Sequence, residues 1–384
     1  MDKPSSEVKG QRPPPAAQQS AVVRLAWIFG TRDDLMLLRL PLLAEIVQRR
    51  HKVLAIVPDL SSADTSILSG LGIEFCLSSH PKTSVNPFAA VMSRRRLTQQ
   101  LHDWRTSAVV VEDPSSLESS VRAAVQAGLH KIYPALPALE RGPAPSGART
   151  SWRATLELAS AVFVPTANDT RLIEQATHKS LPRIAVFPPV ALNLSDLRAC
   201  PLPPLGDGLV LLGAASRRDI ETSAFAAAAK SLGGRCRFRT IDLGDDGRGR
   251  LANAAPGIEL VQGPLTPASI RSAVEDAHVV VIDDIGAAHI LLLATALAIG
   301  RPVLAIDVAA YRDFVDAGVN GWLVADGDAA ALTASMAAIL KRPDLLAGMA
   351  RASSQKAERK LDQAAGWQPL FDIVGIADLR RRAA

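Results

Sequence analysis

The run Val279-Val280-Val281-Ile282-Asp283-Asp284 opens the stretch that decides the fold of this chain. Four branched apolar residues in a row are typical of a parallel strand that is buried on both faces. An apolar helical segment, 290–299, then ends at Gly300, a residue type that tolerates the left-handed conformation at a helix C-terminus. Val303-Leu304-Ala305-Ile306 predicts a second buried strand. The stretch therefore predicts strand, helix and strand in a parallel sheet.

The same alternation begins the chain. Residues 22–28 predict a strand, 35–50 a helix and 53–57 a second strand. A turn at Gly318-Val319-Asn320-Gly321, rich in residues that accept a positive φ, leads to a further strand at 322–324. Two βαβ halves in 384 residues indicate an α/β protein with more than one domain.

Two motifs carry a resemblance to a known family. The run Asp316-Ala317-Gly318-Val319-Asn320-Gly321-Trp322-Leu323-Val324, with Asp326-Gly327-Asp328 behind it, resembles the donor-binding half of family 4 glycosyltransferases. Leu37-Leu38-Arg39-Leu40-Pro41-Leu42 looks like the opening of the exopolysaccharide and lipid-linked-oligosaccharide members of that family. The resemblance extends from about residue 22 to 365, and it implies two Rossmann-like domains that face each other across a cleft, the GT-B fold.

The domain limits follow from this resemblance and from a proline-rich segment, 201–207, that is typical of a linker. We expect a disordered tail over 1–20, an acceptor-side domain over 21–200 and a nucleotide-sugar donor-side domain over 208–362. The last segment, 363–384, should pack back on the first domain.

The resemblance also assigns a donor site. Family members hold the sugar and ribose hydroxyls with two glutamates spaced E-x7-E, and Ala287 and Thr295 stand at those positions here. An arginine and a lysine clamp the diphosphate in the family, and Arg217 and Arg218 lie close enough to those slots to substitute, because guanidinium pairs well with phosphate. The donor-binding candidates are Gly213, Arg217, Arg218, Asp283, Asp284, His289 and Thr295.

On the acceptor side the candidates are Gly30 and Arg39. The family usually carries a histidine immediately before that arginine, where this chain has Leu38. It also has a glycine-containing loop at the cleft, where this chain has the stiffer Pro134-Ala135-Leu136-Pro137.

Each candidate has a structural alternative. Arg217 and Arg218 could form an exposed basic turn, and Asp283 with Asp284 could cap a helix. His289 could be a partly buried structural histidine. Other enzyme classes lack their signatures, since the sequence contains no G-x-G-x-x-G, G-x-x-x-x-G-K-[ST] or G-x-S-x-G motif.

Composition limits the remaining possibilities. Three scattered cysteines fit a reducing cytoplasm and give no metal-ligand spacing, so we expect neither a metal nor a cofactor besides the nucleotide-sugar substrate. No segment reaches the ~18 to 20 apolar residues of a membrane span. The runs Arg94-Arg95-Arg96 and Arg380-Arg381-Arg382 lack interleaved aromatics, which disfavours nucleic acid and leaves a solvated face or an anionic membrane surface as alternatives.

Two functional hypotheses follow. The first is a retaining hexosyltransferase that moves a sugar from a nucleotide sugar to a surface polysaccharide or a lipid-linked glycan, in the cytoplasm or at the inner face of the cell membrane. The second is a catalytically inactive relative that binds or stabilises another protein of polysaccharide assembly. The absence of the glutamate pair, the histidine and the glycine loop favours the second hypothesis.

Overall fold

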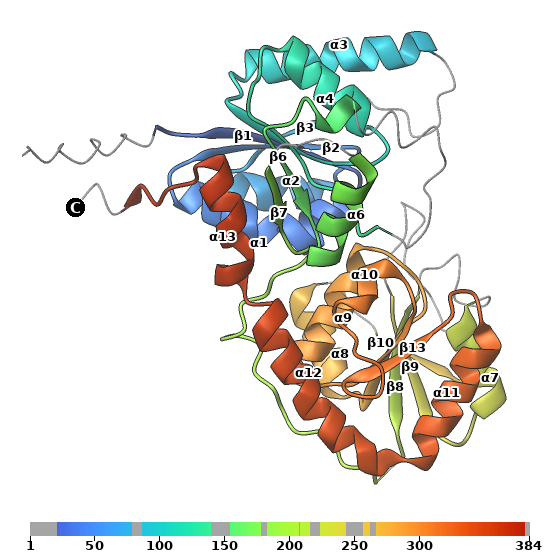
Figure 1. The fold of residues 1–384 in the computed structure, drawn as a ribbon. Helices are drawn as coiled ribbons and strands as arrows, with labels where there is room; N and C mark the ends of the chain where they lie inside the picture. Colours follow the sequence, from blue (N-terminus) through green and yellow to red (C-terminus); the bar gives the residue numbers. More distant parts are fainter. Residues whose placement is uncertain are drawn as a thin grey trace, which may run out of the picture.

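The protein consists of two α/β units, one above the other in Figure 1. This computed structural model describes residues 21–78, 87–139, 154–177, 183–206, 208–215, 223–242, 256–261 and 266–380. Each unit is a parallel sheet with helices on its faces, so the predicted fold class of two Rossmann-like domains is confirmed. The expected tail over 1–20 lies outside the described residues.

The first unit is built on a five-stranded parallel sheet of order β3-β2-β1-β4-β5. Its strands are β1 Arg24–Phe29, β2 Lys52–Val57, β3 Glu74–Leu77, β4 Ala108–Glu112 and β5 Ile132–Pro134. A parallel pair, β6 Ala161–Val164 and β7 Arg183–Val186, continues the sheet through a bridge from Ala135 to Phe163. The helices are α1 Leu40–Gln48, α2 Ser62–Gly70, α3 Pro87–Asp103, α4 Leu117–Gln126 and α6 Ala167–Thr177.

A π-helix, η1 Asp34–Arg39, precedes α1, whereas the sequence predicts one continuous helix over 35–50. Pro41 lies in the first turn of α1, where its missing N–H costs nothing. The break therefore has a cause in the sequence, and π-helical turns occur frequently at functional sites.

The second unit has a six-stranded parallel sheet of order β10-β9-β8-β11-β12-β13. Its strands are β8 Val210–Ala215, β9 Arg237–Asp242, β10 Ile258–Val261, β11 Val279–Ile282, β12 Val303–Ile306 and β13 Gly321–Val324. The helices are α7 Ala224–Leu232, α8 Pro267–Glu275, α9 Ala287–Ile299, α10 Ala309–Arg312, α11 Ala329–Lys341, the short 3₁₀ turn η2 Pro343–Leu345, and α12 Leu346–Lys360. The two predicted strands at β11 and β12 are confirmed in their positions.

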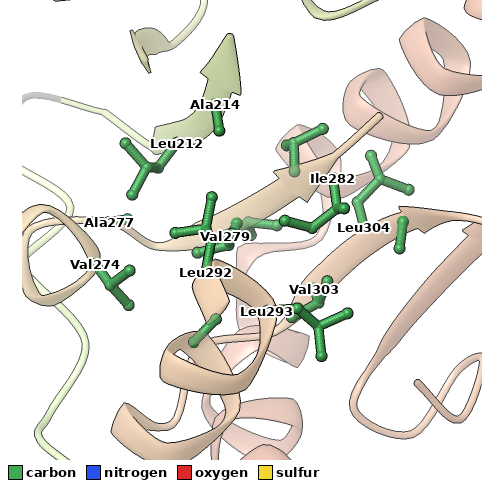
Figure 2. Packing of buried hydrophobic residues seen from close by; sticks show 14 of the residues in the cluster. Leu212, Ala214, Val274, Ala277, Val279, Ile282, Leu292, Leu293, Val303 and Leu304 are labelled. Atoms are coloured by element: carbon green, nitrogen blue, oxygen red, sulfur yellow. The ribbon is translucent and has the colours of Figure 1, made fainter. Parts of the chain in front are cut away.

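Helix α9 lies inside the core of the second unit. Twelve of its thirteen residues are buried, and Ile290 is partly exposed. Leu292 and Leu293 point from α9 toward the apolar side chains of β11 and β12, as Figure 2 shows. A helix that is apolar on all sides needs neighbours on all sides, and α8, α12 and the sheet surround this one. The stretch that decides the fold is thus the centre of the larger core.

The chain crosses between the units twice, and the two crossings are hydrogen-bonded to each other. Leu192 donates its N–H to the Leu361 carbonyl at 2.7 Å and accepts from the Gln363 N–H at 3.1 Å. Beyond the second crossing, helix α13 (Gln363–Val374) packs on the first sheet, and its Trp367 and Phe371 join the apolar cluster around β1.

The proline-rich segment expected to be a linker is fixed to the second unit. Arg301, with no exposed side-chain surface, donates to the carbonyls of Cys200 and Pro201 and to those at the C-terminal end of α8. A cation at a helix C-terminus is favourable, because the helix dipole is negative there. His278 adds a contact, since its Nδ1 accepts from the Val210 N–H and its Nε2 donates to the Pro203 carbonyl.

Candidate functional site

Both units reverse their strand order at the centre of the sheet, and we call the carboxyl end of the strands at that point the crevice of each unit. In the first sheet β1 lies between β2 and β4, and in the second β8 lies between β9 and β11, so the strand order reverses beside β1 and beside β8. Open parallel sheets bind ligands at such reversal points. Of the predicted site residues, Gly30 follows β1 and Asp283 follows β11, and Gly213 lies in the second half of β8.

Arg39 is buried at the crevice of the first unit, and its guanidinium is occupied. Its Nη2 donates to Glu112 Oε1 at 2.6 Å, and its Nη1 donates to the Pro188 carbonyl at 3.0 Å. The guanidinium carbon lies 4.3 Å from the centre of the Phe187 ring, and Trp27 Nε1 donates to the second oxygen of Glu112 at 2.9 Å. Arg39 therefore ties η1 to β4 and to the crossing segment, and an acceptor would have to compete with these contacts.

Asp34, which no sequence motif indicated, begins η1 in the same crevice. Burial raises the pKa of its carboxyl to about 6, although the Thr31 hydroxyl donates to it at 2.7 Å and opposes that shift. A carboxyl that titrates near neutral pH is suited to proton transfer. Its place in the first helical turn after the buried strand β1 was the signal available in the sequence. Gly30 directly follows β1, and a Cβ at Gly30 would come within 3.3 Å of the Asp113 carboxylate.

Two leucines of η1 bring the units into contact. Leu37 and Leu38 are each 8% exposed, and they belong to the apolar cluster of the second unit, together with Ala287 and Leu291 of α9. Leu38 stands where the related family usually has a histidine. Apolar side chains of η1 therefore pack against the second unit, in contact with α9.

Gly213 and Asp283 meet at the N-terminus of α7. A Cβ at Gly213 would come within 2.9 Å of the Phe225 ring, so the glycine lets α7 pack closely on β8. Asp283 Oδ2 accepts the Phe225 N–H at 3.1 Å, and the Ser223 hydroxyl accepts the Ala226 N–H. One carboxylate and one hydroxyl thus already occupy donors of the first turn of α7, which is the capping role proposed as the alternative for Asp283. Arg217 and Arg218, between β8 and α7, lie outside the described residues.

Asp284 is exposed and lies just after β11, at the edge of the sheet where the strands end. Its Oδ1 accepts the Ile285 N–H at 2.7 Å, and its backbone carbonyl accepts from the Tyr311 hydroxyl at 2.6 Å. Burial, with a further contribution from the two aspartates, raises the pKa of Tyr311 well above its usual value. The phenol therefore stays a hydrogen-bond donor that fixes this loop.

The N-terminus of α9 differs from that of α7. Gly286 is its N-cap, and no side chain of the described residues caps the helix. His289 is 6% exposed, and its Nδ1 lies 3.4 Å from where a Gly286 Cβ would be, so the ring lies beside the N-cap. Thr295 is 2% exposed and stands six residues further along α9, about 9 Å along the axis. The structure brings His289 to the crevice and places Thr295 in packed core.

The D-x-G-x-N-G turn has a structural role. The Asn320 side chain, 1% exposed, accepts the Asp316 N–H at 2.7 Å and donates to the Phe314 carbonyl at 2.9 Å. Gly321 runs against the Val303 carbonyl, leaving no room for a Cβ. Lys356 of α12 pairs with Asp316 at 2.9 Å, so the turn links β13 to α12.

Metal-ligating clusters and membrane-spanning helices are both absent from the part of the chain that the structure describes. No group of three or more histidine, cysteine, aspartate or glutamate side chains there is arranged to hold a metal ion. None of the helices in the described ranges combines the length and apolarity needed to cross a bilayer.

Comparison with known proteins supports the assignment of the fold. Residues 209–342, about a third of the chain, match the family described as glycosyl transferases group 1. No curated protein sequence matches the chain.

Solved structures match over nearly the whole length. A glycosyltransferase from Rickettsia africae is 12% identical, with a TM-score of 0.65 over 92% of this chain and 98% of its own. Anabaena Alr3699/HepE in complex with UDP and glucose is 12% identical, with a TM-score of 0.65 over 92% and 100%. Sucrose-phosphate synthase from Thermosynechococcus elongatus is 14% identical, with a TM-score of 0.64 over 94% and 99%. The chain accordingly has the two-domain GT-B fold of glycosyltransferases.

Proposed function

We propose that this protein is a glycosyltransferase that moves a hexose from a nucleotide sugar to a surface polysaccharide or a lipid-linked glycan, with retention of the anomeric configuration. The observation that carries the proposal is the match of residues 209–342 to glycosyl transferases group 1, because these residues include the whole sheet of the second unit, with its crevice at β8 and β11. The Anabaena structure holds UDP and glucose, which supports a UDP-sugar as the donor class.

The donor's diphosphate would bind between α7 and α9. Ser223 and Asp283 already occupy N–H groups of α7, whereas no described side chain caps α9, so the N-terminus of α9 is the better anion site. Arg217 and Arg218 follow β8 in the sequence and are our proposed counter-charge, in place of a metal ion or other cofactor.

The acceptor would approach from the first unit, along the crevice that contains Gly30 and Asp34. In the transfer the acceptor's hydroxyl oxygen bonds to the anomeric carbon, and the bond from that carbon to the diphosphate oxygen breaks. The hydroxyl proton leaves with the nucleoside diphosphate. Leu37 and Leu38 have to withdraw from α9 for both substrates to meet there.

A second candidate function is supported by that same apolar contact. With Leu37 and Leu38 packed on α9, and Thr295 buried, the two units form a continuous core at the point where a sugar would be held. A protein that stays in this arrangement would serve as a non-catalytic binding partner of a transferase.

Calorimetry against a panel of nucleoside diphosphates and nucleotide sugars separates the two functions. Arg217→Ala with Arg218→Ala should weaken nucleoside-diphosphate binding by ~2 to 4 kcal/mol, since two charge-assisted contacts would be lost. Arg235→Ala, an exposed arginine of the same unit, is the control and should bind as the unaltered protein does. Absence of binding to every compound, together with absence of sugar release from every nucleotide sugar, would favour the non-catalytic function.

A further inference from the structure

The exposed residues of α3 change from apolar to basic and then to neutral polar along the helix. Its first turns expose Phe88, Val91 and Met92, whose exposed fractions are 72%, 37% and 50%. The opposite face is buried through Leu97 and Leu101, which pack in the cluster between α3, α4 and the sheet. The exposed apolar side chains are therefore on the face that points away from the protein.

Positive and then neutral polar residues follow on the same face. Arg95 and Arg96 are exposed about two turns after Phe88, and Gln99 is exposed one turn later. Phe88, Met92, Arg95 and Gln99 succeed one another at spacings of three to four residues, which aligns them along the helix. At 1.5 Å per residue, Arg95 lies about 10 Å from Phe88 along the axis.

This order matches the layers of an anionic bilayer. Interfacial helices bury apolar side chains about 5 to 10 Å below the headgroups, and arginine remains at the phosphates. A helix that enters obliquely by its N-terminus would place Phe88 among the acyl chains, Arg95 at the phosphates and Gln99 in water. A surface that binds a protein would not need apolar, basic and neutral polar side chains in this order along one face of the helix.

The helix is directed toward the candidate site. Trp104, just after α3, donates to Glu74 at the start of β3 at 2.9 Å, and the Arg24 guanidinium at the start of β1 lies 4.3 Å from its ring centre. The C-terminus of α3 is thus at the amino ends of the strands, and its N-terminus extends toward their carboxyl ends, where the crevice lies. In Figure 1, α3 is on the side of the first unit remote from the second.

We propose that the N-terminal turns of α3 insert into an anionic phospholipid bilayer, with Phe88, Val91 and Met92 in the acyl region and Arg95 and Arg96 at the phosphates. The carboxyl edge of the first sheet then faces the membrane surface. If the proposed function holds, this position brings a lipid-linked acceptor to the crevice, and the insertion itself requires no nucleotide sugar.

Sedimentation of the full chain with vesicles of phosphatidylglycerol and phosphatidylcholine, without nucleotide sugar, tests the surface. Arg95→Gln with Arg96→Gln should lower the affinity about thirty-fold, because each basic residue near such a surface contributes about 1 kcal/mol. Phe88→Ser with Met92→Ser should lower it by about tenfold or more and should do so at high salt as well.

Two controls match these changes in kind and exposure. Arg122→Gln removes an exposed arginine from the neighbouring helix α4, and Val319→Ser removes an exposed apolar residue from the second unit. Both should bind vesicles as the unaltered protein does. Equal binding by the test variants and the controls, or binding to phosphatidylcholine alone with the same affinity, would overturn the proposal.

Insertion depth is an independent measurement. The indole introduced by Phe88→Trp should be quenched by brominated acyl chains, and the one introduced by Gln99→Trp should not, each compared with the unaltered protein. Equal quenching of both would mean that the helix does not enter by its N-terminus. If the unaltered protein transfers sugar and does not bind the vesicles, only the membrane surface is refuted. If it binds the vesicles and transfers no sugar from any nucleotide sugar, only the proposed transfer is refuted.

Discussion

The Arg39–Glu112 pair offers a sharp test of what the first crevice does. The resemblance to glycosyltransferases assigns Arg39 to the acceptor, whereas the structure uses its guanidinium to join η1, β4 and the crossing segment at Pro188. Arg39→Met keeps most of the side-chain length and removes every one of these hydrogen bonds. Glu112→Gln removes the charge of its partner and keeps the shape.

The expected size of the effect follows from burial. The side chains of Arg39 and Glu112 are 4% and 18% exposed, with Nη2 and Oε1 2.6 Å apart. Removal of one partner from a buried pair costs about 3 to 5 kcal/mol, because the other charge stays desolvated. Because Trp27 still donates to Glu112, we expect Arg39→Met to lower the free energy of unfolding by about 3 kcal/mol. The double variant should lower it by less than the sum of the two single changes.

Urea unfolding followed by circular dichroism measures these differences, with the unfolding of each unit fitted separately because a two-domain protein need not unfold in one step. Arg122→Met is the control, since Arg122 and Glu118 form an exposed i,i+4 pair, 52% and 47% exposed, of the kind that contributes about 0.3 to 0.5 kcal/mol. If Arg39→Met unfolds at the same urea concentration as the unaltered protein and loses only sugar transfer, Arg39 contacts the acceptor and does not hold η1, β4 and the crossing segment together.

Three further changes test other buried positions. Thr295→Glu should destabilise the fold by about 3 kcal/mol or more in thermal unfolding, because it places an unpaired carboxylate in packed core; a stable variant with tighter nucleotide binding would reveal an open donor site instead. Gly213→Ala should lower the stability of the second unit by about 1 to 3 kcal/mol, as its Cβ meets the Phe225 ring, and unchanged unfolding would show that α7 moves freely. Burial lowers the pKa of His51 and of His278 below the usual 6.5, so the folded state favours the neutral rings. Stability should therefore be complete above about pH 6.5 and decline as the pH falls below it, and replacing both histidines with glutamine should flatten that slope in a pH series of unfolding midpoints.

The sequence predicts the centre of the second unit well and the contacts of the site poorly. Strands β11 and β12 are continuous apolar runs bounded by Asp283 and by Arg301-Pro302, and such runs have few alternatives in an α/β chain. The sequence pattern does not predict the π-helix η1, although Pro41 marks the point where the regular helix begins. Periodicity identifies buried positions, but it does not distinguish one kind of helical turn from another.

Spacing in the sequence does not predict which charged residues pair with each other. Arg39 meets Glu112 across 73 positions, and Asp283 caps α7 through the N–H of Phe225, which lies 58 residues before it. Both contacts arise because the carboxyl ends of parallel strands lie at one edge of the sheet. Sequence reasoning can therefore predict which residues lie at that edge, but not which of them form pairs. The predictions for Arg217 and Arg218 remain untested, since these residues lie outside the described ranges.

The apolar contact between the units links the two candidate functions quantitatively. Burial of a leucine side chain contributes about 1.5 to 3 kcal/mol, so Leu37 and Leu38 together favour the closed arrangement by at most about 3 to 6 kcal/mol. A nucleotide sugar that needs an open crevice binds with an affinity reduced by the fraction of open molecules. Replacing both leucines with serine would remove this bias without touching a polar group of the donor site. A donor that binds the double serine variant and not the unaltered protein would then identify a transferase held closed, whereas absence of binding to both would assign the closed arrangement to a protein without a donor.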